Sequence, residues 1–506
     1  MIKNFKWLIL VSLTIIACNS NDDDKVVEVP LTAGTADFSK FVSLGNSLTA
    51  GFSDGALFIK GQEGSYTNIL AQQFALVGGG EFKIPLMNDN IGGLLLGGNV
   101  IQGPRLYFNG SSPLPVTGPP TTEASTVLTG PFNNMGVPGA KSFHLLAPNY
   151  GDLSLVGTGA ANVYYARFAS SPSARIIDDA VAQTPTFFSL WIGNNDVLSY
   201  ATSGGIGVNQ TGNLNPATYG GNDITDPNVF GSVYATLIDA LTANGAKGVV
   251  ANIPYVSTVP FFTTVPTNPI PLDEATAGSL NTNIFGPLNN ILIAYGQPAR
   301  FNTLTASGKN PLLIKDESLV NFSAQITGAL IGAGVPPGQA GLMGNLYGQA
   351  RHASNAPETK DFILLTARGI IGSIQPGIPV PFNRVGVTFP MQDNTTLTAA
   401  ENLEIKVATD AYNSSILAIA TSKGLAFVDA NALLTQVANG GVIANNFTVT
   451  SAYVTGGGFS LDGVHPSARG YALIANKFIE AINTTYGSNL KGVSLENYRI
   501  LYPQIL

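Results

Sequence analysis

Short apolar runs alternate with longer segments of helical periodicity along most of the chain. Four runs predict buried strands, over Phe41–Leu44, Thr186–Ile192, Gly248–Ile253 and Leu425–Val428. Apolar residues spaced three or four positions apart predict helices over Tyr66–Val77, Val229–Leu241, Ala399–Lys423 and Pro466–Tyr486. Strands that alternate with helices, and are apolar throughout, are typical of a doubly wound parallel sheet in the α/β class.

Two stretches interrupt this alternation. Residues 81–130 are rich in Gly, Pro and Thr and show no sustained period. Residues 257–398 hold Pro-rich apolar loops and one predicted helix, Leu272–Tyr295. Because helix and strand signals resume after each stretch, we interpret both as large loop insertions into one domain that covers residues 37–506.

The composition is that of a folded protein with long uncharged loops. Hydrophobic residues make up 45% of the 506 residues, enough for a sizeable core, whereas charged residues make up only 11%. The 57 glycines and 31 prolines indicate many turns. The net charge of −7 argues against a nucleic-acid partner, which would need a basic face.

The N-terminus has the pattern of an export signal. Lys3 and Lys6 precede the apolar run Trp7–Ala17, which is shorter than the ~20 residues that a membrane span needs. Residues 1–17 are therefore predicted to be a signal peptide. The single cysteine, Cys18, follows in Ile-Ile-Ala-Cys, which resembles a bacterial lipobox. The alternative is a plain signal peptide with an incidental cysteine.

A lipobox implies that Cys18 is acylated and becomes the mature N-terminus. Residues 18–36 are then a lipidated tether, whose acidic run resembles the surface-export signals of Bacteroidetes lipoproteins, although a solvated tether explains it equally well. We expect an exported protein held at the outer membrane or cell surface by this anchor. With one cysteine, no disulfide, thiolate metal site or cysteine nucleophile can form within the chain.

Metal and phosphate motifs are weak. The three histidines are His144, His352 and His465, and no pair has the i, i+4 spacing of a helical metal site, so no metal is expected. We interpret His144 and His352 as ordinary surface or loop histidines. Residues 136–142 superficially resemble a phosphate-binding loop, but Ala140 stands where that motif has glycine.

Two serines lie in motifs that could supply a nucleophile. Ser53 is the centre of a G-x-S-x-G match over Gly51–Gly55, but that motif needs a strand directly before it and a helix directly after it, and the flanking residues here predict neither. Ser47 lies in Gly-Asn-Ser-Leu, where the strand Phe41–Leu44 ends. Ligands bind at the carboxyl edge of parallel sheets, so Ser47 is the better candidate.

Ser47 also belongs to the first of four blocks that occur in fixed order in the SGNH (GDSL) hydrolase family. The chain resembles that family at Gly45-Asn46-Ser47-Leu48, Asn134 to Gly139, Gly193-Asn194-Asn195-Asp196 and Asp462-Gly463-Val464-His465. The resemblance covers residues 36–80, 131–256 and 400–486, and it implies a flavodoxin-like three-layer α/β/α architecture, the SGNH hydrolase fold. Asn46 departs from the aspartate of the family, and Asp196 is expected to be a structural hydrogen-bond acceptor.

The resemblance implies a role for each block. Ser47 is the expected nucleophile, His465 is the base that takes its proton, and Asp462 orients the imidazole. The backbone N–H groups of Ser47 and Gly139 and the side-chain amide of Asn195 are expected to form the oxyanion hole. No metal or organic cofactor is expected.

The expected function is therefore that of an extracytoplasmic serine hydrolase with lipase- or esterase-like activity on a small-molecule, lipid or glycan ester. Two alternatives stay open. One is a glycan O-acetyl esterase that uses the same site. The other is a surface binding lipoprotein that keeps the scaffold without turnover.

The insertion at 257–398 follows a predicted strand at the edge of the sheet that carries the active site, so we expect it to lie over or beside Ser47. Its apolar side chains are expected to line a groove that prefers longer acyl chains to acetate; they include Phe261, Phe262, Ile284, Phe285, Leu292 and Ile293. The alternative is that these residues build a small core of the insertion itself.

Overall fold

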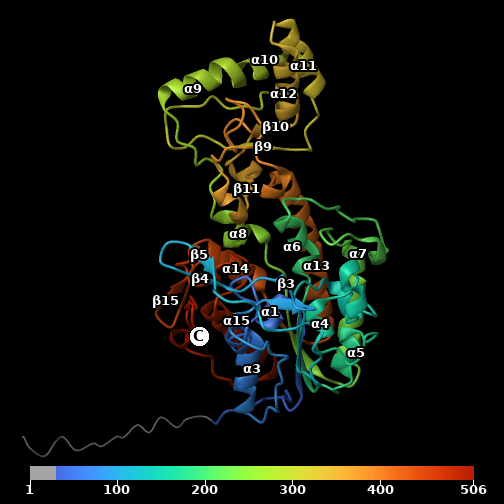
Figure 1. Cartoon of the computed structure of the whole chain (residues 1–506). Coiled ribbons are helices and arrows are strands. Elements are labelled where there is room, and N and C mark those ends of the chain that lie inside the picture. The colour runs from blue at the N-terminus through green and yellow to red at the C-terminus, as the bar shows by residue number, and fades with distance from the viewer. Residues whose placement is uncertain (1–29) are drawn as a thin grey trace, which may run out of the picture.

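Five parallel strands form the central sheet of the structure, a computed structural model in which residues 30–506 are described (Figure 1). They are β1 (Phe41–Gly45), β6 (Asn134–Gly136), β7 (Phe187–Trp191), β8 (Lys247–Ala251) and β13 (Ala426–Val428). The spatial order is β13-β8-β7-β1-β6. In chain order this is 2-1-3-4-5, one of the two common orders of doubly wound sheets, and it places the topological switch point between β1 and β7.

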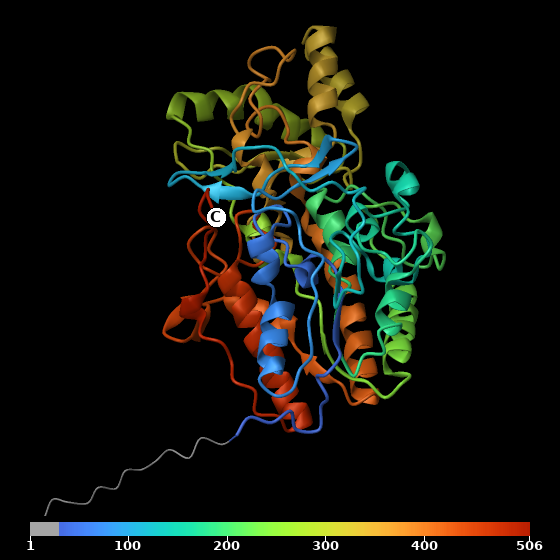
Figure 2. The ribbon, with the colours of Figure 1, turned by 60° about the horizontal axis from the view of Figure 1, so that its bottom comes forward.

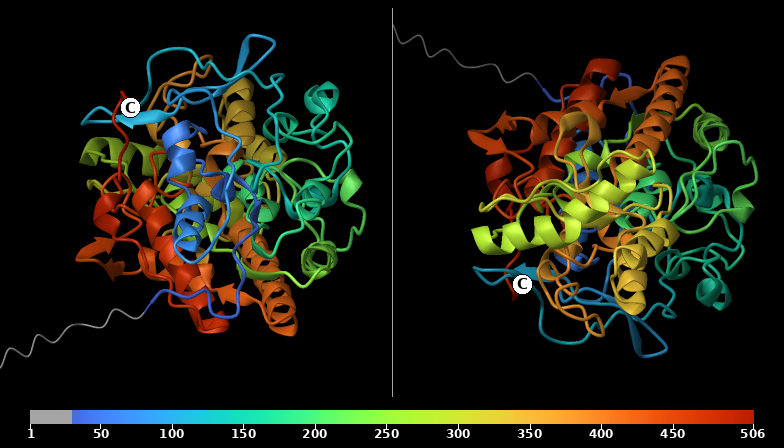
Figure 3. Two further views of the ribbon diagram at one scale, coloured as in Figure 1. Left: turned by 90° about the horizontal axis from the view of Figure 1, so that it is seen from below. Right: turned by 90° about the horizontal axis from the view of Figure 1, so that it is seen from above.

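Helices cover both faces of the sheet, so the predicted α/β class is confirmed. Helices α3 (Tyr66–Ala75) and α15 (Ala468–Tyr486) pack together on one face, and α7 (Pro227–Thr242) and α13 (Ala399–Ser422) pack together on the other (Figure 3). Every residue of β1 and β7 is buried, as expected for strands covered on both sides. The predicted signal peptide, Cys18 and residues 19–29 of the predicted tether lie outside the described residues.

The four predicted strands and four predicted helices are confirmed, with shifts at their ends. No end shifts by more than two residues. Helix α15 begins at Ala468 and not at Pro466, because the Ser467 side chain accepts a hydrogen bond from Gly470 N–H and caps the helix. The edge strand β6 has only three residues and was not predicted as a strand.

The shorter elements complete the layers and loops around the sheet. They are α1 (Ser47–Ala50), α2 (Ile59–Glu63), α4 (Val163–Ala166), α5 (Ile176–Val181), α6 (Asn195–Thr202), α14 (Ala430–Ala438), and the pair β14 (Val442–Ala444) and β15 (Phe447–Val449). None of the helices among residues 30–506 has the length and apolar character that a membrane span requires.

Residues 81–130 form two small antiparallel hairpins joined by loops, drawn in light blue in Figure 2. The hairpins pair β2 (Leu94–Leu96) with β3 (Asn99–Gln102), and β4 (Leu106–Phe108) with β5 (Pro113–Pro115). Leu94 is fully buried against Leu57 and Met87 in a small cluster outside the main core. The segment thus packs on the loops that follow β1.

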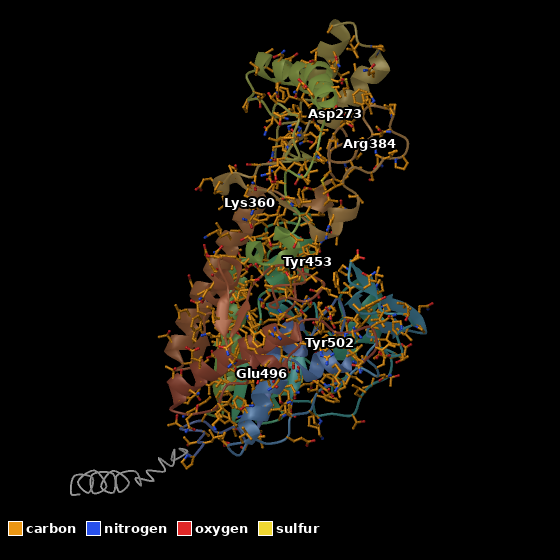
Figure 4. All side chains as sticks on the ribbon, turned by 90° about the vertical axis from the view of Figure 1, so that its left-hand side faces the viewer. Asp273, Lys360, Arg384, Tyr453, Glu496 and Tyr502 are labelled. Atoms are coloured by element: carbon orange, nitrogen blue, oxygen red, sulfur yellow. The ribbon has the colours of Figure 1, made fainter. Side chains whose placement is uncertain are left out.

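Residues 257–398 stand above the carboxyl edge of the sheet as a largely helical body (Figures 1 and 4). Figure 4 labels Asp273 and Arg384 on this body, well away from Glu496 and Tyr502 beside the sheet. Its elements are α8 (Pro260–Thr263), α9 (Glu274–Leu280), α10 (Gly286–Ala294), β9 (Leu313–Lys315), α11 (Ser323–Gly332), α12 (Pro337–Tyr347), β10 (Ala350–His352), β11 (Phe362–Ile363) and β12 (Thr396–Leu397).

The expectation that the apolar residues of this segment line a substrate groove is wrong for those it named. Ile284, Phe285 and Leu292 are buried in a core of the segment itself, and Ile293 is exposed. Phe261 and Phe262 belong to the main core instead. The predicted helix Leu272–Tyr295 exists as α9 and α10 joined by a π-helical turn, whereas α11 and α12 were not predicted.

Candidate active site

The four sequence blocks converge at the switch point of the sheet. Ser47 is the first residue of α1, two residues after β1 ends, and Asn195 is the first residue of α6, four residues after β7 ends. Gly139 follows the edge strand β6, and His465 lies on the loop that precedes α15. Because β6, β1 and β7 are parallel neighbours, their carboxyl ends bring these loops to one place.

Ser47, His465 and Asp462 form one hydrogen-bonded chain. The Ser47 hydroxyl oxygen lies 2.8 Å from Nε2 of His465, and Nδ1 of His465 lies 2.9 Å from Oδ2 of Asp462. An ionised carboxylate only accepts hydrogen bonds, so Nδ1 carries the proton of a neutral imidazole. Nε2 is then free to accept the proton of the serine hydroxyl.

The Asp462 carboxylate is held in its ionised form. Oδ1 accepts hydrogen bonds from the backbone N–H groups of Val464 and His465, each at 2.8 Å, and Oδ2 accepts another from Gly55 N–H at 2.9 Å. Burial alone would raise the pKa of Asp462. Its proximity to His465 and the hydrogen bonds outweigh burial and hold that pKa below its ordinary value.

Three hydrogen-bond donors belong to Ser47 itself and to the loops that follow the two neighbouring strands. Ser47 begins a helix, so its N–H has no intrahelical acceptor, and the N–H of Gly139 likewise meets no backbone acceptor within residues 30–506. The Asn195 side chain donates one amide hydrogen to the carbonyl of Ala140 at 2.9 Å. That bond places its amide next to the residue after Gly139 and leaves its second hydrogen for another acceptor.

Asp196 fixes the two donor loops to each other. It is fully buried, and its carboxylate accepts hydrogen bonds from the backbone N–H of Ser142 at 2.8 Å and the Ser142 hydroxyl at 2.7 Å. Burial raises the pKa of Asp196, against the effect of these bonds. The prediction of a structural acceptor is confirmed. Lys141 is also buried and donates to the carbonyl of Asp223 at 2.6 Å, so the 136–142 loop does not present it to a phosphate.

Asn46 links the turn after β1 to the turn after β7. Its Oδ1 accepts from Leu48 N–H at 3.1 Å, and its Nδ2 donates to Oδ1 of Asn194 at 3.2 Å. An amide can do both, whereas an ionised aspartate could only accept. Asparagine at position 46 therefore makes a hydrogen bond to Asn194 that an ionised aspartate could not donate.

Ser53 is not placed as a nucleophile. Its side chain is fully buried, and its hydroxyl donates to the carbonyl of Pro466 at 3.1 Å. The structure also lacks the strand-to-helix turn that a G-x-S-x-G elbow needs, because the match lies in a turn between α1 and α2.

An apolar pocket opens at Ser47, Asn195 and His465. Its walls come from α6, from the loop after β8, from α14 and from the loop before α15, and they include Leu198, Tyr255, Val256, Val259, Leu434 and Phe459. Sequence analysis did not single out these residues, because an apolar residue in a loop has the same signal whether it lines a pocket or a core. Of them, only Val259 belongs to the 257–398 segment.

His144 and His352 are not surface histidines, which corrects the prediction. His352 is only 5% exposed, and its Nδ1 accepts from Asn302 N–H at 2.7 Å; burial lowers its pKa to about 4. The His144 ring is half-buried and stacks on Tyr150, and burial lowers its pKa to about 3. Burial thus favours the neutral form of both rings, and each accepts a backbone N–H with Nδ1.

One set of three carboxylates among the described residues could hold a metal ion. Oxygens of Glu317, Asp393 and Glu401 lie within 4.8 Å of one another, where the 257–398 segment meets the start of α13. Burial, and next the close carboxylate of Glu317, raise the pKa of Asp393 to about 7. Burial and the same neighbour also raise the pKa of Glu401, to about 8.

Comparisons of the chain with family models, with curated proteins and with solved structures find no match.

The raised pKa values of Asp393 and Glu401 indicate how the stability of the protein should depend on pH. A carboxyl whose pKa is raised by folding binds its proton more tightly in the folded state, so the free energy of unfolding falls as pH rises from about 4 to about 8. Glu401→Gln removes one of the three crowded carboxyl groups. Measured by urea unfolding at pH 5 and at pH 8.5, the free energy of unfolding should fall between the two pH values by less in this variant than in wild type, with a difference of about 1 kcal/mol or more. Glu404→Gln, on the exposed side of the same helix, should lose as much free energy of unfolding between the two pH values as wild type. Equal slopes for wild type and Glu401→Gln would contradict the prediction.

Proposed function

We propose that the chain is a serine ester hydrolase of the SGNH type, with the SGNH hydrolase fold. The observation that carries the proposal is the hydrogen-bonded order Ser47–His465–Asp462, with 2.8 Å and 2.9 Å between successive side chains. A serine hydroxyl becomes a useful nucleophile only when a base removes its proton, and that base must itself be oriented. The free donors beside Ser47 supply the other requirement, charge stabilisation at the developing oxyanion.

In the acylation step, the Ser47 oxygen attacks the carbonyl carbon of the ester, and its proton passes to Nε2 of His465. The electron pair of the C=O bond moves onto the carbonyl oxygen, which the N–H groups of Ser47 and Gly139 and the Asn195 amide would bind. When the intermediate collapses, the alcohol leaves with the proton from Nε2, and an acyl ester of Ser47 remains. Asp462 stays ionised and stabilises the transient imidazolium.

In the deacylation step, water takes the place of the alcohol. It gives one proton to Nε2 of His465 as its oxygen attacks the acyl carbon, and the same donors bind the second oxyanion. Collapse returns the proton to the Ser47 oxygen and releases the carboxylic acid. Both steps therefore use the same residues in the same roles.

The pocket favours an ester with an apolar acyl chain. Side chains such as Val256, Val259 and Phe459 offer no hydrogen-bonding partners to a sugar, whereas they would exclude water from an alkyl chain. A glycan acetate would place only a methyl group there. The O-acetyl esterase and the non-catalytic binding lipoprotein accordingly become outcomes of the tests below.

We further propose that the enzyme is exported and lipid-anchored. The support is the sequence pattern around Cys18, which lies outside the described residues.

Ser47→Ala should abolish ester hydrolysis and covalent labelling by a fluorophosphonate, with a loss in kcat of about 10⁶-fold, as for other nucleophile deletions. Ser53→Ala is the matched control for the nucleophile and should still be labelled and hydrolyse the ester, since the Ser53 hydroxyl contacts a backbone carbonyl and no imidazole. Hydrolysis of p-nitrophenyl butyrate and gel detection of the label measure both. Labelling that persists in Ser47→Ala would overturn the assignment, and a wild-type protein that neither hydrolyses nor labels would favour the binding lipoprotein.

Asn195→Ala should lower kcat by about 10²–10³, the cost of losing one oxyanion donor, with a smaller change in KM. Steady-state kinetics measure the two constants separately. If kcat is unchanged, Asn195 only caps the turn after β7 and the proposed oxyanion hole is wrong.

Substrate choice should follow the pocket. Each methylene buried there is worth about 0.8 kcal/mol, so kcat/KM should rise about fourfold per carbon from acetate until the pocket is full. Leu198→Trp, at a half-buried position on α6, should remove the preference for longer chains and spare acetate turnover. A series of p-nitrophenyl esters and acetylated glycans tests this. Glycan acetates as the best substrates would favour the O-acetyl esterase instead.

A further inference from the structure

A short turn behind the catalytic loop contacts that loop with every one of its residues. The turn comprises Phe52, Ser53, Asp54 and Gly55 and is called here the 52–55 turn. The catalytic loop comprises Ser460–Pro466, which carries Asp462 and His465. The two segments are about 400 residues apart in the chain, so their contacts exist only in the folded protein.

The contacts between turn and loop are specific. The Phe52 ring lies 4.6 Å from the His465 ring, centroid to centroid, and the Ser53 hydroxyl donates to the carbonyl of Pro466 at 3.1 Å. Gly55 N–H donates to Oδ2 of Asp462 at 2.9 Å, the same oxygen that faces the imidazole. The turn thus touches both the acid and the base.

Asp54 contributes two hydrogen bonds at the centre of this contact. Its backbone N–H donates to the Ser460 hydroxyl at 3.0 Å, and its Oδ1 accepts from Leu461 N–H at 2.9 Å. Asp54 is only 1% exposed, and its other carboxylate oxygen has no hydrogen-bond partner among the described residues. Burying a carboxyl group whose second oxygen has no hydrogen-bond partner costs free energy of folding. The partner of its first oxygen is Leu461, the residue directly before Asp462.

The backbone of Asp54 is also in an uncommon conformation. Its φ is +52°, in the left-handed region that few residues other than Gly, Asn and Asp adopt. Ser53 and Ala56 close the turn around it with two backbone hydrogen bonds of 3.1 Å each. This conformation lets the side chain of Asp54 and the N–H of Gly55 face the same loop.

The 81–130 segment holds the turn from the opposite side. Leu106 N–H donates to the carbonyl of Asp54 at 2.8 Å, and the Gln102 side chain donates to the carbonyl of Gly55 at 3.0 Å. Arg105, in the same segment, is fully buried and donates to the carbonyls of Asn90 and Pro503. The turn is therefore fixed between this segment and the catalytic loop.

We propose that Asp54 is a positioning residue that holds the Asp462–His465 pair in register with Ser47, and that residues 81–130 act on the active site through it. The proposal rests on the proposed function. Asp54 touches neither substrate nor the reacting atoms in this scheme; it acts through Leu461, Ser460 and the neighbouring N–H of Gly55.

The charges around Asp54 agree with this role. Burial raises its pKa to about 7, and the nearby Asp462 adds to that effect while Arg105 opposes it. Burial, and next the charge of Asp54, raise the pKa of Tyr502, and Asp54 also helps to raise the pKa of Tyr453. Of the two neighbouring acids, Asp54 therefore takes a proton more readily, and Asp462 keeps the negative charge that the imidazolium needs.

The test measures kcat and KM of Asp54→Ala, Asp54→Gly and Asp54→Asn with p-nitrophenyl butyrate. Asp54→Ala should lower kcat by about 10²-fold, the effect of a small misplacement of catalytic groups, while KM changes by less than about twofold. Asp54→Gly keeps the left-handed turn without the carboxyl and should show the same loss. Asparagine also adopts the left-handed conformation, and its side-chain oxygen can still accept from Leu461 N–H. The kcat of Asp54→Asn should therefore stay within about threefold of that of wild type.

Asp361→Ala is the matched control, because Asp361 is an equally buried acid that pairs with Arg351 in the 257–398 segment. It should lower thermal stability but leave kcat unchanged. If Asp54→Ala does not fold, Asp54→Gly decides the question. The proposal is overturned if Asp54→Gly folds with wild-type kcat, or if Asp54→Asn loses as much activity as Asp54→Gly. A wild-type protein without activity or labelling would instead refute the proposed function.

Discussion

The close approach of helix α1 to the strands β1 and β6 is the constraint on which the site depends. Gly136 ends β6 where a side chain would collide with the backbone of α1, since an added Cβ would stand 2.3 Å from the nitrogen of Ala50. Gly45 pairs with Gly136 on one side and with Trp191 on the other. Because both positions lack a side chain, α1 lies directly on the strand ends. Ser47, at its first residue, then meets the loops that follow both neighbouring strands.

This arrangement also explains why the donors are free. Ser47 is the first residue of a helix, and the first N–H groups of a helix have no partner within it. Asn195 uses one hydrogen of its side-chain amide for the carbonyl of Ala140 and keeps the other. Polar groups beside them are buried yet satisfied: Asp196 is bonded to Ser142, and Asn46 to Leu48 and Asn194. Such bonds fix the loops without using the groups that face Ser47. The Ser47 N–H and the second amide hydrogen of Asn195 are thus left without a protein acceptor among the described residues.

The parts of the fold that the sequence predicts are those whose environment is uniform. Strands such as Phe187–Trp191 are covered on both faces, so their sequence is apolar at every position except Ser189. The strand β6 has only three residues, too few for a period, and α12 carries three glycines that weaken its helical signal. The four blocks predicted which side chains meet at Ser47, because each block lies at a strand end or before a helix.

What sequence could not predict depends on contacts between distant segments. Phe285 and Val259 are both apolar residues in the same insertion, yet one packs in the core of that insertion and the other lines the pocket. His352 looks like any loop histidine until β9 and β10 pair and bury it. The 52–55 turn is the clearest case. It lies within the G-x-S-x-G match at Gly51–Gly55, which has the form of a nucleophile motif but lacks its flanking elements. Its contacts with Leu461 and Asp462 are visible only in three dimensions.

The catalytic loop is held from two directions, and this relates the two insertions to the site. Phe261 N–H, at the start of the 257–398 segment, donates to the carbonyl of Gly463 at 2.9 Å, between Asp462 and His465. The 52–55 turn holds the other side of the same loop. A Cβ at Gly463 would stand 3.1 Å from the nitrogen of Phe261, so only glycine at this left-handed position lets the two segments meet so closely. Asp462 and His465 therefore lie on a loop that the 257–398 segment contacts directly and that the 81–130 segment reaches through the 52–55 turn.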